Sequence, residues 1–398
     1  MSASKFQEAL ISQNDKSTQL GLNQAINVGP REFHIQTSTL VDEGLVRTEV
    51  FERGRLLFVE YFPYERRDIA HNLGVEERLK SIVDQFHQSI IEEIDSLFEV
   101  SERLMEEKQA SAHEKIGLVF LYMHIFEKAE KHLLKALELE PGRFSSSIYL
   151  GKCYFFQKRY NKAYQILSKL LPRDVNYPDL YNLLGLIMLE KKNYGAAFKY
   201  FKQALKFNSS YIEVYFNLCE TMLQRIIPLQ KSGKNEEVEK SINFLNIILK
   251  KINNLGKVEE RSQSAQISKL LSEKSFGKAL HMVREFREKQ YLNRTPPEVH
   301  GYKFYLRLFY NDEEMSSVVL EGYEEKIAEE LHRNPSYPDL WHYLALIHLM
   351  QCRHYFLKGL DNFRDATRIN PNFEKALKNL RLVENDGREF LAMIKTFV

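Results

Sequence analysis

The chain is 398 residues long, which is enough for more than one compact unit. Hydrophobic residues make up 44% of it and charged residues 28%, whereas glycine and proline number only 17 and 11. This composition excludes collagen-like and disordered chains and favours helix. The 56 Lys and Arg residues nearly balance the 54 Asp and Glu residues, and no long block of like charge occurs. We therefore expect neither a nucleic acid nor a membrane as partner.

The cysteines and the first residues bear on the location of the protein. Cys153, Cys219 and Cys352 lie far apart and predict neither a disulfide framework nor a zinc knuckle, as is usual in a reducing compartment. The first 20 residues lack the charged start and apolar run of a secretory signal. The longest apolar stretch, residues 116–126, is roughly half as long as a membrane-spanning helix. We therefore predict a cytoplasmic protein without a membrane span.

The front of the chain alternates with a period of two. This pattern begins at Arg31, so we expect residues 1–30 to form a poorly ordered lead. Phe33, Ile35 and Thr37 alternate with polar neighbours, and a turn at Gly54 separates two later runs of the same kind. Residues 31–65 are therefore predicted to form a three-stranded antiparallel ribbon, which must pack on something because it is small. The segment resembles one found in bacterial repeat proteins of unknown function, which implies no activity.

Residues 66–109 are predicted to contain one long amphipathic helix that connects the ribbon to the rest of the chain. Its apolar stripe consists of Leu79, Ile82, Val83, Phe86, Ile90, Ile94, Leu97 and Leu104. Such a stripe suits either docking on the first element that follows or pairing in a coiled coil. We favour docking, because a stack of helices needs a cover on its first apolar face.

Small side chains recur at a fixed interval in the middle of the chain. Gly117, Gly151 and Gly185 stand 34 residues apart, and Ala129, Ala163 and Ala197 keep the same spacing. Two helices can cross closely only where Gly or Ala lets their backbones approach, while larger side chains fill the neighbouring holes. Residues 110–211 are therefore predicted to form three regular units of two helices each.

These units resemble the tetratricopeptide repeat (TPR). In the unit at 178–211 the signature positions of the family hold Tyr181, Leu184, Gly185, Met188, Tyr194, Ala197, Phe201 and Ala204. The resemblance implies a mainly α fold in which successive helix pairs stack into a right-handed α–α superhelix, or solenoid. With the ribbon and the connecting helix, this completes the expected fold.

The repeat pattern weakens after residue 211. Residues 212–336 are predicted to be degenerate helical repeats with insertions, the first of them in the polar stretch around Gly233. Residues 337–398 are predicted to be a TPR-like unit followed by capping helices, because the segment that starts at Tyr337 nearly repeats the one that starts at Tyr177. The two capping helices are expected at 373–383 and 386–397.

No arrangement of side chains in the sequence indicates catalysis. His342, His348 and His354 are evenly spaced, but a step of six residues turns a helical side chain by about 600°, so the three do not converge on one metal ion. Phosphate-loop, nucleophile-elbow and zinc-protease patterns are missing. We expect no catalytic residue, no cofactor and no metal site, and hence no enzyme.

The resemblance instead implies a binding groove on the concave side of the solenoid, lined by the first helix of each unit. We expect the partner to be a protein or peptide with apolar or aromatic anchors. A competing interpretation is that part of the chain itself, such as residues 75–108 or the long loop at Gln230, already occupies this surface. The residues predicted to contact a partner are Leu118, Tyr122, Ile148, Tyr149, Lys152, Phe155, Phe156, Asn182, Leu186, Phe216, Asn217 and Glu220.

The sequence thus predicts a non-enzymatic adaptor, a scaffold that holds a segment of a partner protein in its groove. One alternative is a self-assembling structural protein, a homo-oligomer joined through the long helix and the open edges of the ribbon. A further alternative is an accessory or regulatory subunit of an enzyme complex.

Overall fold

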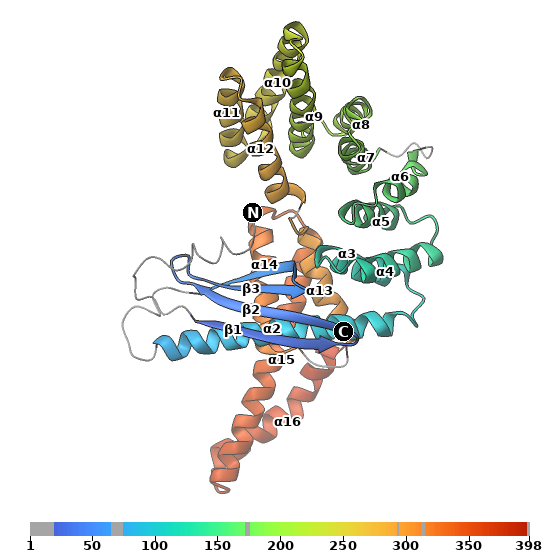
Figure 1. Cartoon of the computed structure of the whole chain (residues 1–398). Helices are drawn as coiled ribbons and strands as arrows, with labels where there is room; N and C mark the ends of the chain where they lie inside the picture. The colour runs from blue at the N-terminus through green and yellow to red at the C-terminus, as the bar shows by residue number, and fades with distance from the viewer. Residues whose placement is uncertain (1–19, 65–74, 172–175, 293, 312–314, 396–398) are drawn as a thin grey trace. The chain divides into compact units, whose positions relative to one another are not determined.

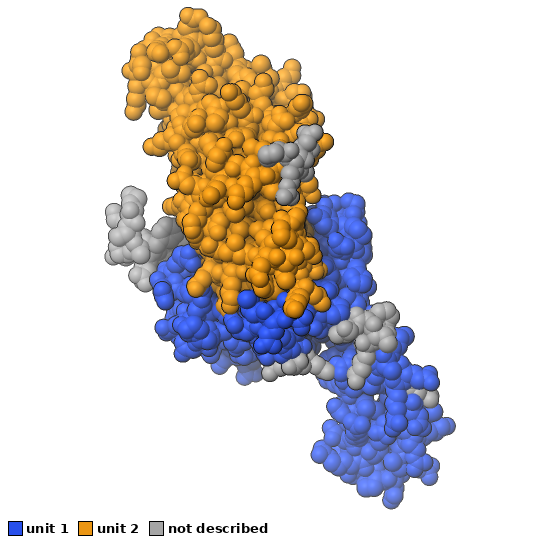
Figure 2. All heavy atoms as spheres, turned by 90° about the vertical axis from the view of Figure 1, so that its right-hand side faces the viewer, with its two compact units in different colours: residues 1–107, 300–398 blue, residues 108–299 orange. Residues whose placement is uncertain are grey.

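The computed structural model describes residues 20–64, 75–171, 176–292, 294–311 and 315–395. The chain divides into two compact units, which Figure 2 shows in different colours. Unit 1 combines residues 1–107 with residues 300–398, and unit 2 consists of residues 108–299. This division differs from the predicted one, because the last part of the chain forms a compact unit with the N-terminal sheet instead of continuing the row of repeats.

The N-terminal part of unit 1 is an antiparallel sheet in the order β1-β2-β3-β4 (Figure 1). Its strands are β1 (Gly21–Val28), β2 (Arg31–Leu40), β3 (Leu45–Glu52) and β4 (Arg55–Pro63). The predicted antiparallel ribbon is confirmed, but it has four strands where the sequence predicts three. The added strand β1 lies within the segment expected to be a poorly ordered lead, of which residues 1–19 are outside the described residues. Most of its side chains are exposed, so alternation was a weak signal there.

Helix α2 (Val75–Leu104) provides the support that the small sheet needs. It contacts β1, β2 and β3, and the rings of Phe33 and Phe98 lie 5.6 Å apart between their centroids. At the same interface the Thr37 hydroxyl lies 2.8 Å from Nδ1 of His87. The apolar stripe of the long helix therefore packs on the sheet, a role that we did not assign to it from the sequence.

Four further helices complete unit 1: α13 (Pro297–Tyr310), of which residues 297–299 are assigned to unit 2, α14 (Ser317–Arg333), α15 (Pro338–Ile369) and α16 (Glu374–Lys395). The sequence predicts a helix pair and two capping helices after residue 336, whereas α15 is one continuous helix of 32 residues and α16 is a second. No residue between Pro338 and Ile369 has the positive φ that turns the chain between helices elsewhere. Gly387 lies inside α16, and a Cβ there would come 2.2 Å from the Phe356 ring of α15, so this glycine lets the two helices pack closely.

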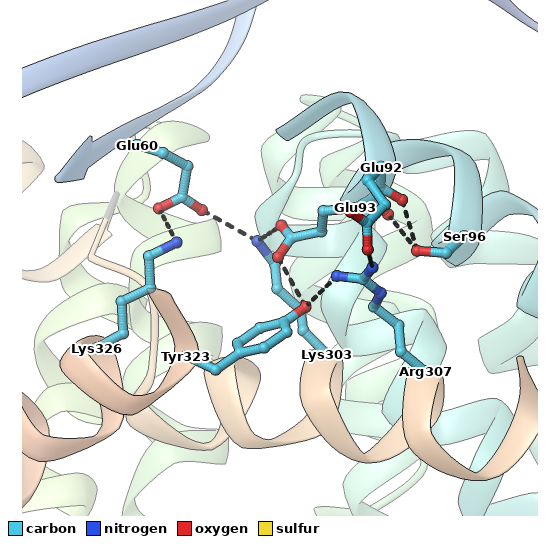
Figure 3. Close-up of polar contacts among 8 residues, drawn as sticks. All are labelled: Glu60, Glu92, Glu93, Ser96, Lys303, Arg307, Tyr323 and Lys326. Carbon is cyan, nitrogen blue, oxygen red and sulfur yellow. Dashed lines mark hydrogen bonds and ion pairs between the residues drawn. The ribbon is translucent and has the colours of Figure 1, made fainter. Parts of the chain in front are cut away.

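A buried charge cluster joins the sheet, α2, α13 and α14 within unit 1 (Figure 3). Nζ of Lys303 lies 2.6 Å from a carboxylate oxygen of Glu93 and 3.1 Å from one of Glu60, although the Lys303 side chain is only 3% exposed. Nζ of Lys326 lies 2.8 Å from the other oxygen of Glu60. The cluster consists of Glu60 of β4, Glu93 of α2, Lys303 and Arg307 of α13, and Tyr323 and Lys326 of α14.

Tyr323 and Arg307 provide further hydrogen bonds to the carboxylates of α2. The Tyr323 hydroxyl donates to Glu93 over 2.8 Å, and the Arg307 guanidinium donates to Glu92 over the same distance. Burial alone would raise the pKa of the Glu93 carboxyl, but Lys303 and Lys326 lower it below its ordinary value. The charges are therefore retained inside the unit because each has partners from other elements.

Unit 2 begins with three helix pairs: α3 (Ala110–Tyr122) with α4 (Phe126–Leu139), α5 (Phe144–Phe156) with α6 (Tyr160–Ser168), and α7 (Pro178–Glu190) with α8 (Tyr194–Phe207). A Cβ on Gly117, Gly151 or Gly185 would lie 2.8, 2.6 or 2.5 Å from a side chain of the paired helix. The predicted reason for the 34-residue spacing, close approach of the paired helices, is thus confirmed.

The turns inside the pairs repeat as well. His124, Lys158 and Lys192 lie two residues after the end of the first helix of each pair and have φ of 55°, 58° and 58°. Lys274 has the same conformation between α11 (Val258–Ser272) and α12 (Phe276–Arg287). The pair α11–α12 is therefore turned in the same way as the regular repeats.

The first four helices after residue 211 contact one another in a closed ring. Helix α9 (Ile212–Lys231) contacts α10 (Asn235–Leu255), α10 contacts α11, α11 contacts α12, and α12 returns to α9. A short π-helix, η3 (Glu288–Leu292), follows α12. We call α9 to α12 the closed bundle. It lies in the first part of residues 212–336, for which the sequence predicts degenerate helical repeats with insertions.

The close approach in the repeats can be tested with two glycine variants in one helix pair. Gly185→Ala should destabilise α7–α8 by about 1–3 kcal/mol, because the new Cβ overlaps the Phe201 ring. Gly195→Ala in α8 should be neutral or stabilise the pair, because no atom lies within 4 Å of the added Cβ and alanine favours helix. Hydrogen exchange of the α7 and α8 amides measures both effects. Equal protection in the two variants would contradict the packing argument.

The charge cluster can be tested by removing one cation. Lys303→Met should cost unit 1 about 3–5 kcal/mol, because Glu60 and Glu93 keep buried charges with fewer partners. The control Arg368→Met breaks an exposed pair with Asp365 in the same unit and should cost less than about 1 kcal/mol. Urea denaturation followed by fluorescence of the single tryptophan, Trp341 in unit 1, measures the difference. Similar losses in both variants would show that the cluster adds little.

Candidate protein-binding face of the repeats

The first helices of the repeats form one layer of unit 2. Helix α3 contacts α5, α5 contacts α7, and α7 contacts α9. We call the surface of this layer that holds the predicted partner-contacting residues the inner face. The repeat geometry produces it, because equivalent positions of successive first helices recur side by side.

Lys152 of α5 lies on this face, and its side chain is partly buried. Its ammonium donates to the Tyr122 hydroxyl of α3 and lies 4.9 Å from the centroid of that ring. Burial alone would lower the pKa of Lys152, but Tyr122, Glu213 and Asp179 raise it above its ordinary value. The lysine is therefore charged at neutral pH and already has compensating partners.

Polar side chains continue from α7 to α9. The amide nitrogen of Asn182 donates to Glu213 over 2.9 Å, and that of Asn217 donates to the Asn182 oxygen over 2.7 Å. The Tyr211 hydroxyl donates to Asp179 over 2.7 Å. Burial raises the pKa of the Glu213 carboxyl. These contacts satisfy the polar groups of the face among themselves and fix the spacing of its helices.

Helix α12 covers the inner face at α9. Phe216 is fully buried there, with ring centroids 4.8 Å from Phe286 and 6.0 Å from Tyr291. Glu220, only 1% exposed, pairs with Arg284 over 2.7 Å and with Arg287 over 3.0 Å. The chain itself therefore occupies this part of the face, but the covering segment is α12 and neither of the two segments named from the sequence.

Three of the predicted contact residues, Phe216, Asn217 and Glu220, are thus placed inside the closed bundle, where no partner reaches them. The arginines that cover them were missed in the sequence. A signal was present, because Glu220 lies on a helix side lined by Phe216 and other apolar residues, and a buried carboxylate requires a cation from elsewhere in the chain.

The other predicted contact residues divide by exposure. Leu118, Tyr122, Phe155, Asn182 and Leu186 are buried. Partial exposure is kept by four side chains of α5, which we call the α5 patch: Ile148, Tyr149, Lys152 and Phe156. The Phe156 ring also stacks on Phe126, with centroids 6.3 Å apart. Helix α5 therefore carries the predicted contact residues that are both partly exposed and, apart from Lys152, apolar or aromatic.

The described residues offer little for chemistry. No group of three or more His, Cys, Asp and Glu side chains among them is arranged to hold a metal ion. Burial raises the pKa of the Cys153 thiol to about 12, so this cysteine is not a thiolate at neutral pH. Within the same part of the chain, no helix combines the length and apolar character that crossing a bilayer requires.

Comparison with known proteins supports the repeat assignment. Residues 125–187 and 178–211 match the tetratricopeptide repeat family, so the chain carries TPR units. The tetratricopeptide repeat-containing protein trd-1 of Caenorhabditis elegans is 23% identical over 147 residues, which is 34% of this chain. The match spans only 19% of the length of that relative.

Two solved structures are similar to part of this chain. The TPR protein TTC0263 of Thermus thermophilus is 14% identical and aligns with 61% of this chain and 100% of its own, with a TM-score of 0.29. Pseudomonas aeruginosa pilF is 18% identical over 59% of this chain and 96% of its own, with a TM-score of 0.30.

The covering of the inner face by α12 can be tested at Glu220. Glu220→Ala should loosen α12 by about 3 kcal/mol or more, because Arg287 is left buried without its carboxylate. The control Glu138→Ala removes the exposed partner of Lys135 on α4 and should change little. Faster hydrogen exchange in α12 only in the first variant is the expected result. Unchanged protection in both would show that apolar packing alone holds α12.

Proposed function

We propose that this protein is a non-enzymatic interaction scaffold and that its α5 patch holds a segment of a partner protein. The observation that carries the proposal is the difference between two parts of one face. At α9 the face is filled by α12, whereas at α5 the apolar side chains of Ile148, Tyr149 and Phe156 remain partly exposed. An open apolar surface beside a covered one is the place where a further segment can pack.

The packing of α12 on α9 supports a specific kind of partner. Helix α12 contributes Phe286, whose ring packs on Phe216 of α9, and the arginines that pair with Glu220 lie close to Phe286 in the sequence of α12. An amphipathic helix or an extended segment with an aromatic or aliphatic anchor can pack on α5 in the same manner. The Lys152 charge is already compensated, so the anchor is expected to be apolar rather than acidic.

The proposal includes a cytoplasmic location and needs no cofactor. A role as accessory subunit of an enzyme complex is one form of it, in which the partner is the enzyme. The self-assembling alternative has less support, because the apolar stripe of α2 packs on the sheet of its own unit and is not open for a second copy. Sedimentation at several concentrations distinguishes the two, since self-assembly requires a concentration-dependent mass.

The α5 patch can be tested with Tyr149→Ala/Phe156→Ala. Loss of two aromatic anchors should lower recovery of the partner from native lysate by about tenfold or more. The matched control is Leu134→Ala/Ile247→Ala, which removes two side chains that are 45% and 60% exposed on the second helices α4 and α10. Both variants should keep the circular dichroism of the wild type. Recovery of every partner by the first variant would refute a role for the patch.

A further inference from the structure

The second helices of two repeats carry a surface of different chemistry. Residues 157–171 and 191–212, which include α6 and α8, contain no Asp or Glu. Their cations are Lys158, Arg159, Lys162, Lys169, Lys191, Lys192, Lys199, Lys202 and Lys206. We call the eight lysines the basic surface. All eight are exposed.

The lysines of the two helices lie on neighbouring elements. The hydroxyls of Tyr164 in α6 and Tyr200 in α8 are 3.4 Å apart, which places the two helices side by side. Along α8, Lys199, Lys202 and Lys206 follow one another at steps of three and four residues and therefore share one side of the helix. The lysines thus form an extended row on α8 with further lysines beside it.

No carboxylate compensates these lysines in the described part of the chain: none of the ion pairs recorded there includes one of them. Lys191 contacts the Asn161 amide oxygen over 2.9 Å, and Lys202 lies 5.7 Å from the centroid of the Phe198 ring. The acidic groups at the border are Glu130, which pairs with Arg159, and Glu190, which accepts from Tyr160. Glu130 and Glu190 therefore contact other residues, and neither forms an ion pair with a lysine of the basic surface.

The corresponding helices on either side differ. On α4, Lys135 pairs with Glu138, and on α10, Lys240 pairs with Glu236. Like charges at a spacing of three or four residues destabilise a helix slightly, whereas mixed charges stabilise it. Helix α4 carries lysines at the same spacing, Lys128, Lys131 and Lys135, but with Glu127, Glu130 and Glu138 among them. The lysines of α8 have no such acids beside them. They therefore cause a small loss of stability that an anionic ligand would offset.

We propose that the basic surface binds an acidic segment of a partner protein. The ammonium group of lysine is a compact point charge, unlike the planar guanidinium of arginine. Carboxylates spaced along one side of a helix or an extended segment can pair with a row of such charges. Nucleic acid fits less well. The single arginine of the region, Arg159, has its guanidinium held by Glu130 over 2.6 Å, and the partly buried Tyr164 and Tyr200 hydrogen-bond to each other, so these three side chains already have partners within the chain. This surface differs from the α5 patch and does not depend on it.

The test uses the full chain and two labelled probes of matched charge, oligoglutamate and oligothymidylate, titrated by fluorescence anisotropy at several salt concentrations. The variant Lys199→Glu/Lys202→Glu/Lys206→Glu should weaken oligoglutamate binding by about tenfold or more and flatten its salt dependence. The control Lys250→Glu/Lys251→Glu/Lys278→Glu makes the same change of net charge on α10 and α12, at exposed lysines, and should alter binding by less than about twofold.

Two results would overturn the proposal. Equal weakening in both variants would assign binding to net charge rather than to the row on α8. Tighter binding of oligothymidylate than of oligoglutamate at the same salt concentration would make nucleic acid the ligand class. Tighter binding of oligoglutamate that is lost only in the α8 variant is the supporting result.

Discussion

Close contact between the two helices of each pair is the constraint on which unit 2 depends. The side chains of Leu133, Leu167 and Phe201 fill the space where a Cβ would lie on Gly117, Gly151 and Gly185. Because each pair closes in the same way, the first helices stack at a regular offset and expose equivalent positions. The α5 patch on the inner face and the lysine row on the second helices both follow from that regularity.

Buried charges add contacts that the repeat pattern does not contain. Glu220 attracts two arginines of α12 and thereby closes the bundle at α9, while Lys303 joins Glu60 and Glu93 from segments far apart in the sequence. In both places a charge is taken out of water only because an opposite charge arrives with it. In the function that we propose the first contact matters most, since it leaves the α5 patch as the partly exposed part of the predicted groove.

The sequence was sufficient where structure follows from neighbouring residues. The spacing of Gly151 and Ala163 predicted the helix pairs, and the alternation at Phe33 predicted antiparallel strands. It was insufficient where structure follows from distant contacts. Strand β1 lies at the edge of the sheet, and its mostly exposed side chains alternate little. Helix α15 continues through the segment where the sequence predicts a turn between two helices. Phe216 is buried because α12, which is distant in the sequence, packs on it. The dispersed lysines of α6 and α8 escaped notice because they form no continuous run of charge.

Photocrosslinking from single positions tests the central claim, that a partner occupies the inner face at α5, most directly. A photoreactive phenylalanine analogue in place of Tyr149 is compared with the same analogue in place of Leu134, which is exposed on α4. Our account predicts a discrete crosslinked partner from position 149 and none of that mass from position 134. The same adduct from both positions, or an adduct from position 134 alone, would contradict it.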